Sequence, residues 1–154
     1  MIRRANTDDL HTVVSLTREA YAQYEALLGS HPIPVTEDYA PRIADRQVWL
    51  LEIDGWDVGL IVLEPQEDHL LIFSIAVAPA HQGKGHGIRL LEWSESRARE
   101  IGLQELRLYT NAKMERNIAL YTRFGYRETG RRDNPACPGF IAVDMVKRLD
   151  GAGA

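Results

Sequence analysis

One segment of the sequence, Val77–Ile88, constrains the fold more than any other. It joins an apolar run, Leu70–Ala78, to a helical pattern, and Pro79 ends the run. The loop between them carries three glycines at alternate positions, Gly83, Gly85 and Gly87. Such a loop exposes consecutive backbone N–H groups at a helix N-terminus, where they and the helix dipole suit a phosphate or pyrophosphate. The segment therefore predicts a buried strand, an anion-binding loop and a helix in direct succession.

The spacing of these glycines excludes two common phosphate motifs. No Gly-Lys-Ser/Thr follows four residues after a glycine, as a Walker loop requires. The dinucleotide fingerprint also fails, because the final gap between its glycines is missing. An ordinary strand-to-helix turn remains an alternative for the loop taken alone.

The rest of the chain supplies alternating strand and helix signals. The predicted strands are Met1–Ala5, Val48–Ile53, Val58–Glu64, Leu70–Ala78, Leu103–Tyr109, Tyr126–Gly130 and Phe140–Lys147. The predicted helices run from the Asn6–Asp9 cap to Leu28, from the Thr36–Asp38 cap to Ala44, over Gly87–Ile101 and over Lys113–Phe124. Ser30–Val35 holds two prolines and is predicted as loop. The order βααβββαβαββ indicates a mixed α/β sheet with helices on its faces, and the wholly apolar Leu70–Ala78 is expected to be covered on both faces.

Composition and charge narrow the class of protein. The 154 residues are expected to form one domain over 1–149, with a flexible tail at 150–154. No apolar run is long enough to span a bilayer and the N-terminus has no secretory signal, so we expect a cytoplasmic protein without a membrane partner. The formal net charge of -4 gives no footprint for nucleic acid. Cys137 is the single cysteine, and no His/Cys cluster has metal-ligand spacing.

A second feature lies in the predicted helix Lys113–Phe124. Asn117 and Tyr121 are four residues apart, so they share one helix face, and Gly125-Tyr126 follows. An amide and a phenol on one face can hydrogen-bond an extended ligand and meet its reactive end. An ordinary amphipathic helix with Tyr121 in the core is the alternative.

Together the two segments resemble the GNAT superfamily of N-acetyltransferases. That family carries Gln/Arg-x-x-Gly-x-Gly/Ala after a Val-x-Pro strand end, and this chain has Gln82–Gly87 after Val77-Ala78-Pro79. Family helices of the type Asn-x-x-Ala-x-x-x-Tyr are matched in part by Asn117, Ala119 and Tyr121. The resemblance covers nearly the whole chain and implies the GNAT fold, a mostly antiparallel sheet of about seven strands.

The resemblance also implies a co-substrate and a set of site residues. The co-substrate is acetyl-CoA, with no metal, and the acceptor is a small-molecule or peptide amine. The loop would hold the CoA pyrophosphate, the preceding strand would pair with the pantetheine arm, and Tyr121 would be the general acid for the leaving thiolate. The implied cofactor-binding residues are Ile75, Ala76, Val77, Gln82, Gly83, Lys84, Gly85, His86, Gly87, Ile88, Asn117 and Tyr121.

Several points stay open at this level. The apolar strand Leu70–Ala78 holds no carboxylate, so the general base is one of Glu64, Glu67, Asp68 and His31, or a water chain that ends at one of them. Homodimers are frequent in resembling proteins. A non-catalytic acyl-CoA sensor is the main rival function. A toxin that acetylates charged tRNA is disfavoured by the acidic net charge.

Overall fold

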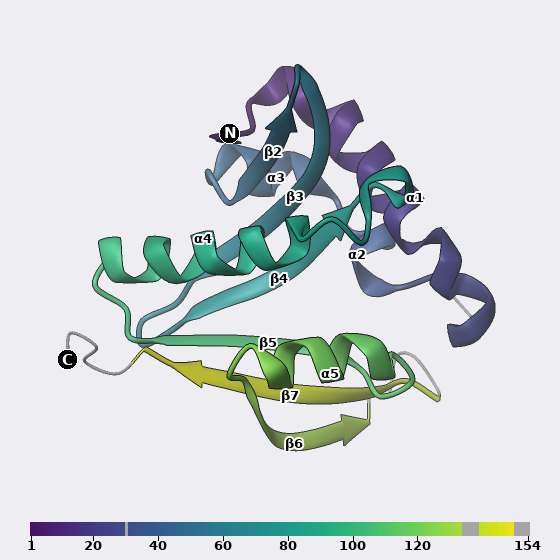
Figure 1. Cartoon of the computed structure of the whole chain (residues 1–154), viewed down its shortest axis with the longest axis vertical. Helices are drawn as coiled ribbons and strands as arrows, with labels where there is room; N and C mark the ends of the chain where they lie inside the picture. The colour runs from purple at the N-terminus through teal and green to yellow at the C-terminus, as the bar shows by residue number, and fades with distance from the viewer. Residues whose placement is uncertain (30, 134–138, 150–154) are drawn as a thin grey trace. The chain divides into compact units, whose positions relative to one another are not determined.

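The computed structural model describes residues 1–29, 31–133 and 139–149 of the chain (Figure 1). These residues form two compact units. The first unit comprises Met1–Glu64 and Ile72–Ser94, and the second comprises Pro65–Leu71 and the chain from Glu95 onward. Cys137 and the predicted tail at 150–154 lie outside the described residues.

Seven strands and five α-helices follow one another along the described chain. The strands are β1 (Ile2–Arg4), β2 (Val48–Ile53), β3 (Trp56–Pro65), β4 (Leu70–Val77), β5 (Glu105–Asn111), β6 (Arg127–Asp133) and β7 (Ile141–Arg148). The helices are α1 (Leu10–Leu28), α2 (Ile33–Thr36), α3 (Tyr39–Ala44), α4 (His86–Glu100) and α5 (Glu115–Arg123). Short 3₁₀ turns at Thr7–Asp9 and Pro79–His81 precede α1 and the glycine loop. None of the helices in the described ranges has the length and apolar character needed to cross a membrane.

The strands form a sheet in the order β1-β2-β3-β4-β5-β7-β6. The pairs β1/β2, β2/β3, β5/β7 and β6/β7 are antiparallel. The pair β4/β5 is parallel and joins Leu70 to Leu106 and Leu71 to Arg107. The predicted fold class, a mixed and mostly antiparallel sheet of seven strands with helices, is therefore confirmed.

Helix α2 corrects the prediction of loop over Ser30–Val35 at Ile33–Val35, while Ser30 lies outside the described residues. Pro32 is its N-cap, Pro34 lies in its first turn, and the N–H of Val35 donates to the carbonyl of Pro32 at 2.9 Å. The N–H groups of a first turn have no intrahelical partner, so proline there costs no hydrogen bond. The sequence argument treated both prolines as helix breakers, which they are only in a helix interior.

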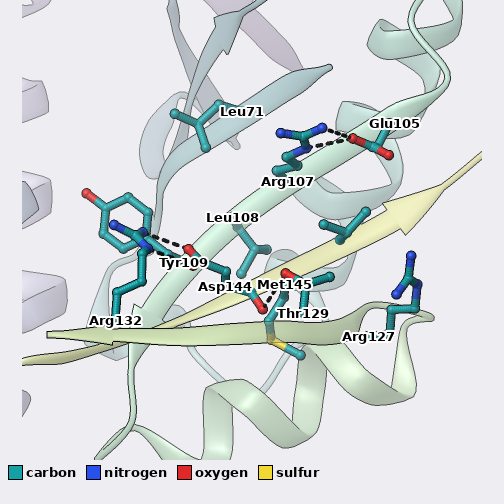
Figure 2. Close-up of a pocket in the computed structure, with 11 residues that line it drawn as sticks. Leu71, Glu105, Arg107, Leu108, Tyr109, Arg127, Thr129, Arg132, Asp144 and Met145 are labelled. Atoms are coloured by element: carbon teal, nitrogen blue, oxygen red, sulfur yellow. Dashed lines mark hydrogen bonds and ion pairs between the residues drawn. The ribbon is translucent and has the colours of Figure 1, made fainter. Parts of the chain in front are cut away.

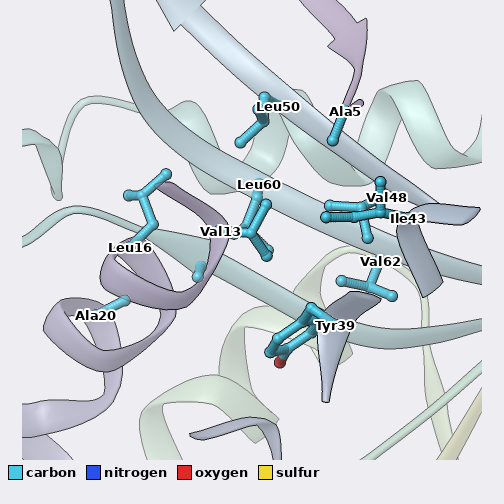
Figure 3. Packing of buried hydrophobic residues seen from close by; sticks show 11 residues of the cluster. Ala5, Val13, Leu16, Ala20, Tyr39, Ile43, Val48, Leu50, Leu60 and Val62 are labelled. Carbon is cyan, nitrogen blue, oxygen red and sulfur yellow. The ribbon is translucent and has the colours of Figure 1, made fainter. Parts of the chain in front are cut away.

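The core of the first unit lies between β2/β3 and the helices α1 and α3 (Figure 3). Val48 and Leu50 of β2 and Leu60 and Val62 of β3 alternate along their strands, so they point to one face. They are fully buried against Val13, Leu16 and Ala20 of α1 and Tyr39 and Ile43 of α3. The first turns of α4 cover the opposite face, because the ring of Trp93 lies 4.6 Å from that of Trp49.

Strand β4 is covered less evenly than its apolar sequence predicts. Leu70, Ile72, Ser74 and Ala76 are buried, and the four residues that alternate with them are half-buried. The prediction that this strand is covered on both faces therefore holds fully for one face and in part for the other. An apolar run reports the hydrophobicity of both faces but not the size of the elements that cover each one.

The second unit contains β5, β7 and the edge strand β6. β6 begins one residue later than predicted and runs on to Asp133, where its last three residues pair with Ile141, Ala142 and Val143 of β7. All its residues but Gly130 are exposed. The predicted strand ended at Gly130, so the charged stretch after it, Arg131–Asp133, was not included. Charged residues are a common feature of an edge strand, where they disfavour pairing with another chain.

Candidate active site

The glycine loop has the backbone geometry of an anion cradle. Gly83 and Gly85 have φ angles of +78° and +82°, in the left-handed region that favours glycine. Helix α4 begins directly after them at His86, and the N–H of Arg89 already donates to the carbonyl of Gly85 at 3.0 Å. The N–H groups of the first helical turn have no partner within the helix, so they are free donors for an anion.

The surroundings of the loop leave room for a ligand. A Cβ atom built on Gly83, Gly85 or Gly87 would meet no heavy atom within 4 Å. Lys84 and Arg89 are exposed, and the half-buried rings of His81 and His86 lie 6.4 Å apart. The loop is therefore open, flanked by cations and lined by backbone donors, which fits a pyrophosphate group.

The motif residue Gln82 anchors this loop through its side chain. Its Nε2 donates to the carbonyl of Val77 at 2.9 Å, and its Oε1 accepts from Nε2 of Gln23 at 3.3 Å. Sequence reasoning assigned only the backbone N–H of Gln82 to the site. The structure adds a second function, because this side chain ties the loop to the end of β4.

The edge of β4 carries the next group of predicted residues, Ile75, Ala76 and Val77. These three residues lie in the first unit, as the glycine loop does. They follow Leu70 and Leu71, the two β4 residues that pair with β5. The hydroxyl of Tyr21 donates to the carbonyl of Ile75 at 3.2 Å and lies 3.3 Å from Oγ of Ser74. The sequence did not predict this contact. The one available signal was a phenol on the apolar face of α1, since a half-buried hydroxyl seeks a partner.

Helix α5 places Asn117 and Tyr121, both half-buried, in the second unit. The turn before the helix is built on the buried Asn111, whose Oδ1 accepts from the N–H of Lys113 at 2.9 Å. The N–H of Met114 donates to the carbonyl of Asn111 at 2.9 Å as well. Asn111, which sequence reasoning did not single out, therefore fixes where α5 starts. Such Asx turns compete with regular structure and are common before helices.

Tyr121 packs against the tyrosine that follows α5. The ring centroids of Tyr121 and Tyr126 lie 5.9 Å apart in an edge-on arrangement, and the N–H of Tyr126 donates to the carbonyl of Tyr121 at 2.9 Å. Tyr126 is buried, and its hydroxyl has no hydrogen-bond partner among the described residues. Burial, reinforced by the nearby Glu95 and Tyr121, raises the pKa of the Tyr126 phenol, so it remains neutral.

The candidate general bases lie in different surroundings. A hydrogen bond from His69 lowers the pKa of the Asp68 carboxyl, and Arg107 acts in the same direction, which makes Asp68 a weaker base. Glu64 pairs with Arg42 at 3.2 Å, and His31 pairs with Glu25 at 2.9 Å. Within the described ranges, no three His, Cys, Asp or Glu side chains are grouped so that they could hold a metal ion.

A hollow of about 610 Å³ lies in the second unit, and its lining includes none of the predicted site residues (Figure 2). Most of the charged side chains that line it form ion pairs with one another. Nη2 of Arg107 lies 2.6 Å from Glu105, and Arg132 forms two hydrogen bonds with Asp144 at 2.6 and 2.7 Å. Arg127 lies away from both pairs in Figure 2. Since its carboxylates are engaged by arginines, the hollow offers no evident base for catalysis.

Comparison with protein families gives a match over most of the chain. The model of the acetyltransferase (GNAT) family matches residues 13–126, which include the glycine loop, Asn117 and Tyr121. Among curated proteins, the probable N-acetyltransferase 14 of Xenopus tropicalis is 31% identical over 91 residues, which are 57% of this chain and 44% of that protein. The N-acetyltransferase 8F1 of Mus musculus is 24% identical over 75% of this chain and 55% of its own. The chain thus spans about half the length of these relatives.

Solved structures share the fold. The ribosomal-protein-S18-alanine N-acetyltransferase from Escherichia coli superposes with a TM-score of 0.78 at 23% identity and covers 97% of this chain and 93% of its own. The PaiA N-acetyltransferase from Thermoplasma acidophilum, solved in complex with coenzyme A, also reaches 0.78, at 20% identity over 96% of this chain and 98% of its own. Because both structures are less than 25% identical to this chain, they show that the fold is shared and nothing further.

Proposed function

The chain belongs to the GNAT family of acetyltransferases, and from this premise we propose that it transfers the acetyl group of acetyl-CoA to a primary amine of a small molecule or peptide. The observation that carries the proposal is the geometry of the glycine loop. Two left-handed glycines, open space at three glycine positions and the free N-terminus of α4 occur together at the motif Gln82–Ile88. Few ligands other than a phosphate or pyrophosphate require that combination.

The loop would hold the pyrophosphate of CoA. The donors would be the backbone N–H groups of Gly83, Gly85, His86, Gly87 and Ile88, whereas the N–H of Gln82 already donates to the carbonyl of Pro79 at 3.3 Å. Glycine permits close approach of the backbone to the phosphate oxygens, and the side chains of Lys84 and Arg89 are exposed and free to approach the same charge. PaiA, which was solved with coenzyme A, supports CoA as the ligand of this fold.

The edge of β4 would hold the pantetheine arm. Pantetheine carries two amide groups that can pair with a strand edge as another strand does. Ile75, Ala76 and Val77 lie beyond the part of β4 that pairs with β5, and they lead directly into the loop. The hydrogen bond from Tyr21 to the carbonyl of Ile75 holds this edge in place. Asn117 would add a side-chain hydrogen bond to the cofactor.

Direct transfer requires the removal of one proton and the delivery of another. A primary amine at neutral pH is mostly ammonium and attacks only after it loses a proton to a base. Backbone N–H groups of β4 would stabilise the negative charge that develops on the thioester oxygen, and one such donor is typically worth about 3–4 kcal/mol. Tyr121 would then donate its phenolic proton to the departing thiolate. The proton of the amine would pass to one of Glu64, Glu67, Asp68 and His31, directly or through a water chain; of these, Glu64 is engaged by Arg42 and Asp68 has a lowered pKa.

An assay of thiol release tests this function. The protein is incubated with acetyl-CoA and a panel of small primary amines and of peptides with a free α-amino group. The peptides are included because the structurally similar protein from Escherichia coli is a ribosomal-protein-S18-alanine N-acetyltransferase. Release of CoA that depends on one class of amine supports the proposal and names the acceptor. Tight binding of acetyl-CoA without release on any amine favours the non-catalytic sensor instead. The predicted cytoplasmic location and homodimer remain predictions.

A further inference from the structure

Lys147 forms a part-buried polar bridge in the second unit. From β7, its Nζ donates to Oε2 of Glu95 at 2.8 Å and to the carbonyl of Phe124 at 2.7 Å. The two charged side chains are 20% and 12% exposed, so neither is solvated as a surface ion would be. Burial of two charges is costly, and such a pair often contributes little to folding stability compared with apolar residues of the same size. Its presence at this place therefore suggests a function other than stability.

The bridge ends at the C-terminus of α5. Phe124 caps this helix, and its carbonyl is one of the groups that have no partner within the helix. A cation at this end also complements the negative pole of the helix dipole. Nζ of Lys147 lies 4.1 Å from the centre of the Phe124 ring, which adds a cation–π contact.

Gly125 makes room for the lysine. Its φ of +103° favours glycine, and a Cβ atom at this position would lie 3.1 Å from Cε of Lys147. The Gly125-Tyr126 pair, which sequence analysis noted only as the end of a motif, is thus shaped around this side chain. Directly after it, Tyr126 packs edge-on against Tyr121, and its N–H donates to the Tyr121 carbonyl at 2.9 Å.

We propose that Lys147, held by Glu95, is a positioning residue for Tyr121. The lysine fixes the last turn of α5 and the Gly125-Tyr126 step, and these fix the backbone and ring of Tyr121. The inference rests on the role proposed above for Tyr121 as general acid. A purely structural bridge would change stability alone, whereas a positioning bridge changes turnover through Tyr121.

The test removes both charges together. The double substitution Glu95→Leu with Lys147→Met keeps similar volumes and leaves no uncompensated buried charge, so the variant is expected to fold. A second pair, Glu95→Gln with Lys147→Gln, is neutral but retains a side-chain donor for the Phe124 carbonyl. Arg148→Met is the matched control, because Arg148 is the next residue of β7, 60% exposed, and pairs with Glu105 at 3.6 Å.

The inference predicts a defined pattern. The Leu/Met variant loses turnover about 100-fold, as expected for a misplaced catalytic group, while the Gln/Gln pair retains most turnover and Arg148→Met all of it. In a Tyr121→Phe background the Leu/Met pair causes no further loss, because both changes act on one step. Backbone amides of Phe124, Gly125 and Tyr126 exchange hydrogen faster in the Leu/Met variant than in the wild type or the control.

Two results would overturn the inference. One is wild-type amide exchange at these three residues in the Leu/Met variant, which needs no activity to be measured. The other is an equal fractional loss of turnover in the presence and absence of the Tyr121 hydroxyl. Normal turnover of Tyr121→Phe alone would reject the acid role of Tyr121 instead, so the two proposals fail in different experiments.

Discussion

The side-chain Nε2 of Gln82 donates a hydrogen bond to the main-chain carbonyl of Val77, 2.9 Å away. This bond joins the first residue of the glycine loop to the last residue of β4. It thereby fixes where the loop leaves the strand and how its backbone N–H groups are presented. The side chain of Gln82 consequently helps to shape the cradle.

Gln82→Ala should weaken acetyl-CoA binding and leave the fold intact. One lost hydrogen bond of about 1 kcal/mol corresponds to a roughly fivefold higher Kd, measured by calorimetric titration. Gln23→Ala is the matched control, because it removes the 3.3 Å bond to Gln82 and a 3.2 Å bond to the carbonyl of Ala20 but leaves the bond from Gln82 to Val77 in place. An equal effect of both substitutions, or no effect of Gln82→Ala, would show that the bond to Val77 does not shape the cradle.

Gly85→Ala should affect both stability and cofactor binding. The φ of Gly85 is +82°, so a Cβ adds backbone strain of about 1–2 kcal/mol to the folded state. Gly102 has a φ of +81° and equally open surroundings, so Gly102→Ala carries the same strain at a distant helix end. Chemical denaturation should give matching losses for the two variants. Only Gly85→Ala should raise the Kd for acetyl-CoA, by about tenfold, and equal affinities in the two variants would place the pyrophosphate elsewhere.

Tyr121→Phe should reduce turnover without weakening cofactor binding. General acid catalysis typically contributes about 10²–10⁴-fold, so a loss of at least about 100-fold is expected at an unchanged Kd for acetyl-CoA. Tyr126→Phe is the paired control on the neighbouring ring. It removes a buried hydroxyl that has no partner in the described chain, so the free energy of unfolding should stay level or rise by about 1 kcal/mol, with turnover retained. A normal rate for Tyr121→Phe would remove this residue from the chemistry.

Asn117→Ala separates a ligand contact from a structural role. The backbone N–H of Asn117 donates to the carbonyl of Met114 at 3.1 Å and is kept in the variant. The side chain is half-buried and has no hydrogen bond to any described residue, so its loss should change the free energy of unfolding by less than about 0.5 kcal/mol. The Kd for acetyl-CoA should rise about fivefold, since one hydrogen bond to the cofactor is lost. A destabilised protein with unchanged affinity would make Asn117 a structural residue.

Asp9 should make stability depend on pH at the acid end. Hydrogen bonds from Arg3 and from the N–H of Asn6 lower the pKa of its carboxyl below the usual 3.8. The folded state therefore favours the charged carboxylate, and this contribution is complete above the usual pKa and is lost as pH falls through the lowered one. Between about pH 5 and pH 2, the wild type should lose more free energy of unfolding than Asp9→Asn. Parallel losses in the two proteins would contradict the shift.

Much of the fold follows from local patterns in the sequence. Helical spacing from Leu10 to Leu28 and the Asp54-Gly55 turn between two strands are short-range signals, and the structure has α1 and the β2/β3 hairpin at these places. The glycine loop was recognisable for the same reason, since its chemistry lies in consecutive residues. Helix α2 was missed because a proline can either begin or break a helix, and its effect depends on the position within the turn.

The contacts that shape the candidate site join residues far apart in sequence. Tyr21 reaches Ile75 across 54 positions, and Gln23 reaches Gln82 across 59. Lys147 meets Glu95 across 52. No spacing rule links such pairs, because the sheet and not the local helix or turn brings them together. Residue types alone indicated which side chains could act, and only the fold showed their partners.

Calorimetric titration of the folded protein with acetyl-CoA measures whether the glycine loop binds a pyrophosphate, with pantetheine, which lacks that group, as the comparison. Acetyl-CoA should bind with a Kd of about 1 μM, near −8 kcal/mol, and pantetheine should bind much more weakly. Absence of binding heat at several temperatures, from a sample that unfolds cooperatively, would show that the loop is not a cofactor site. The glycine loop would then be a structural turn.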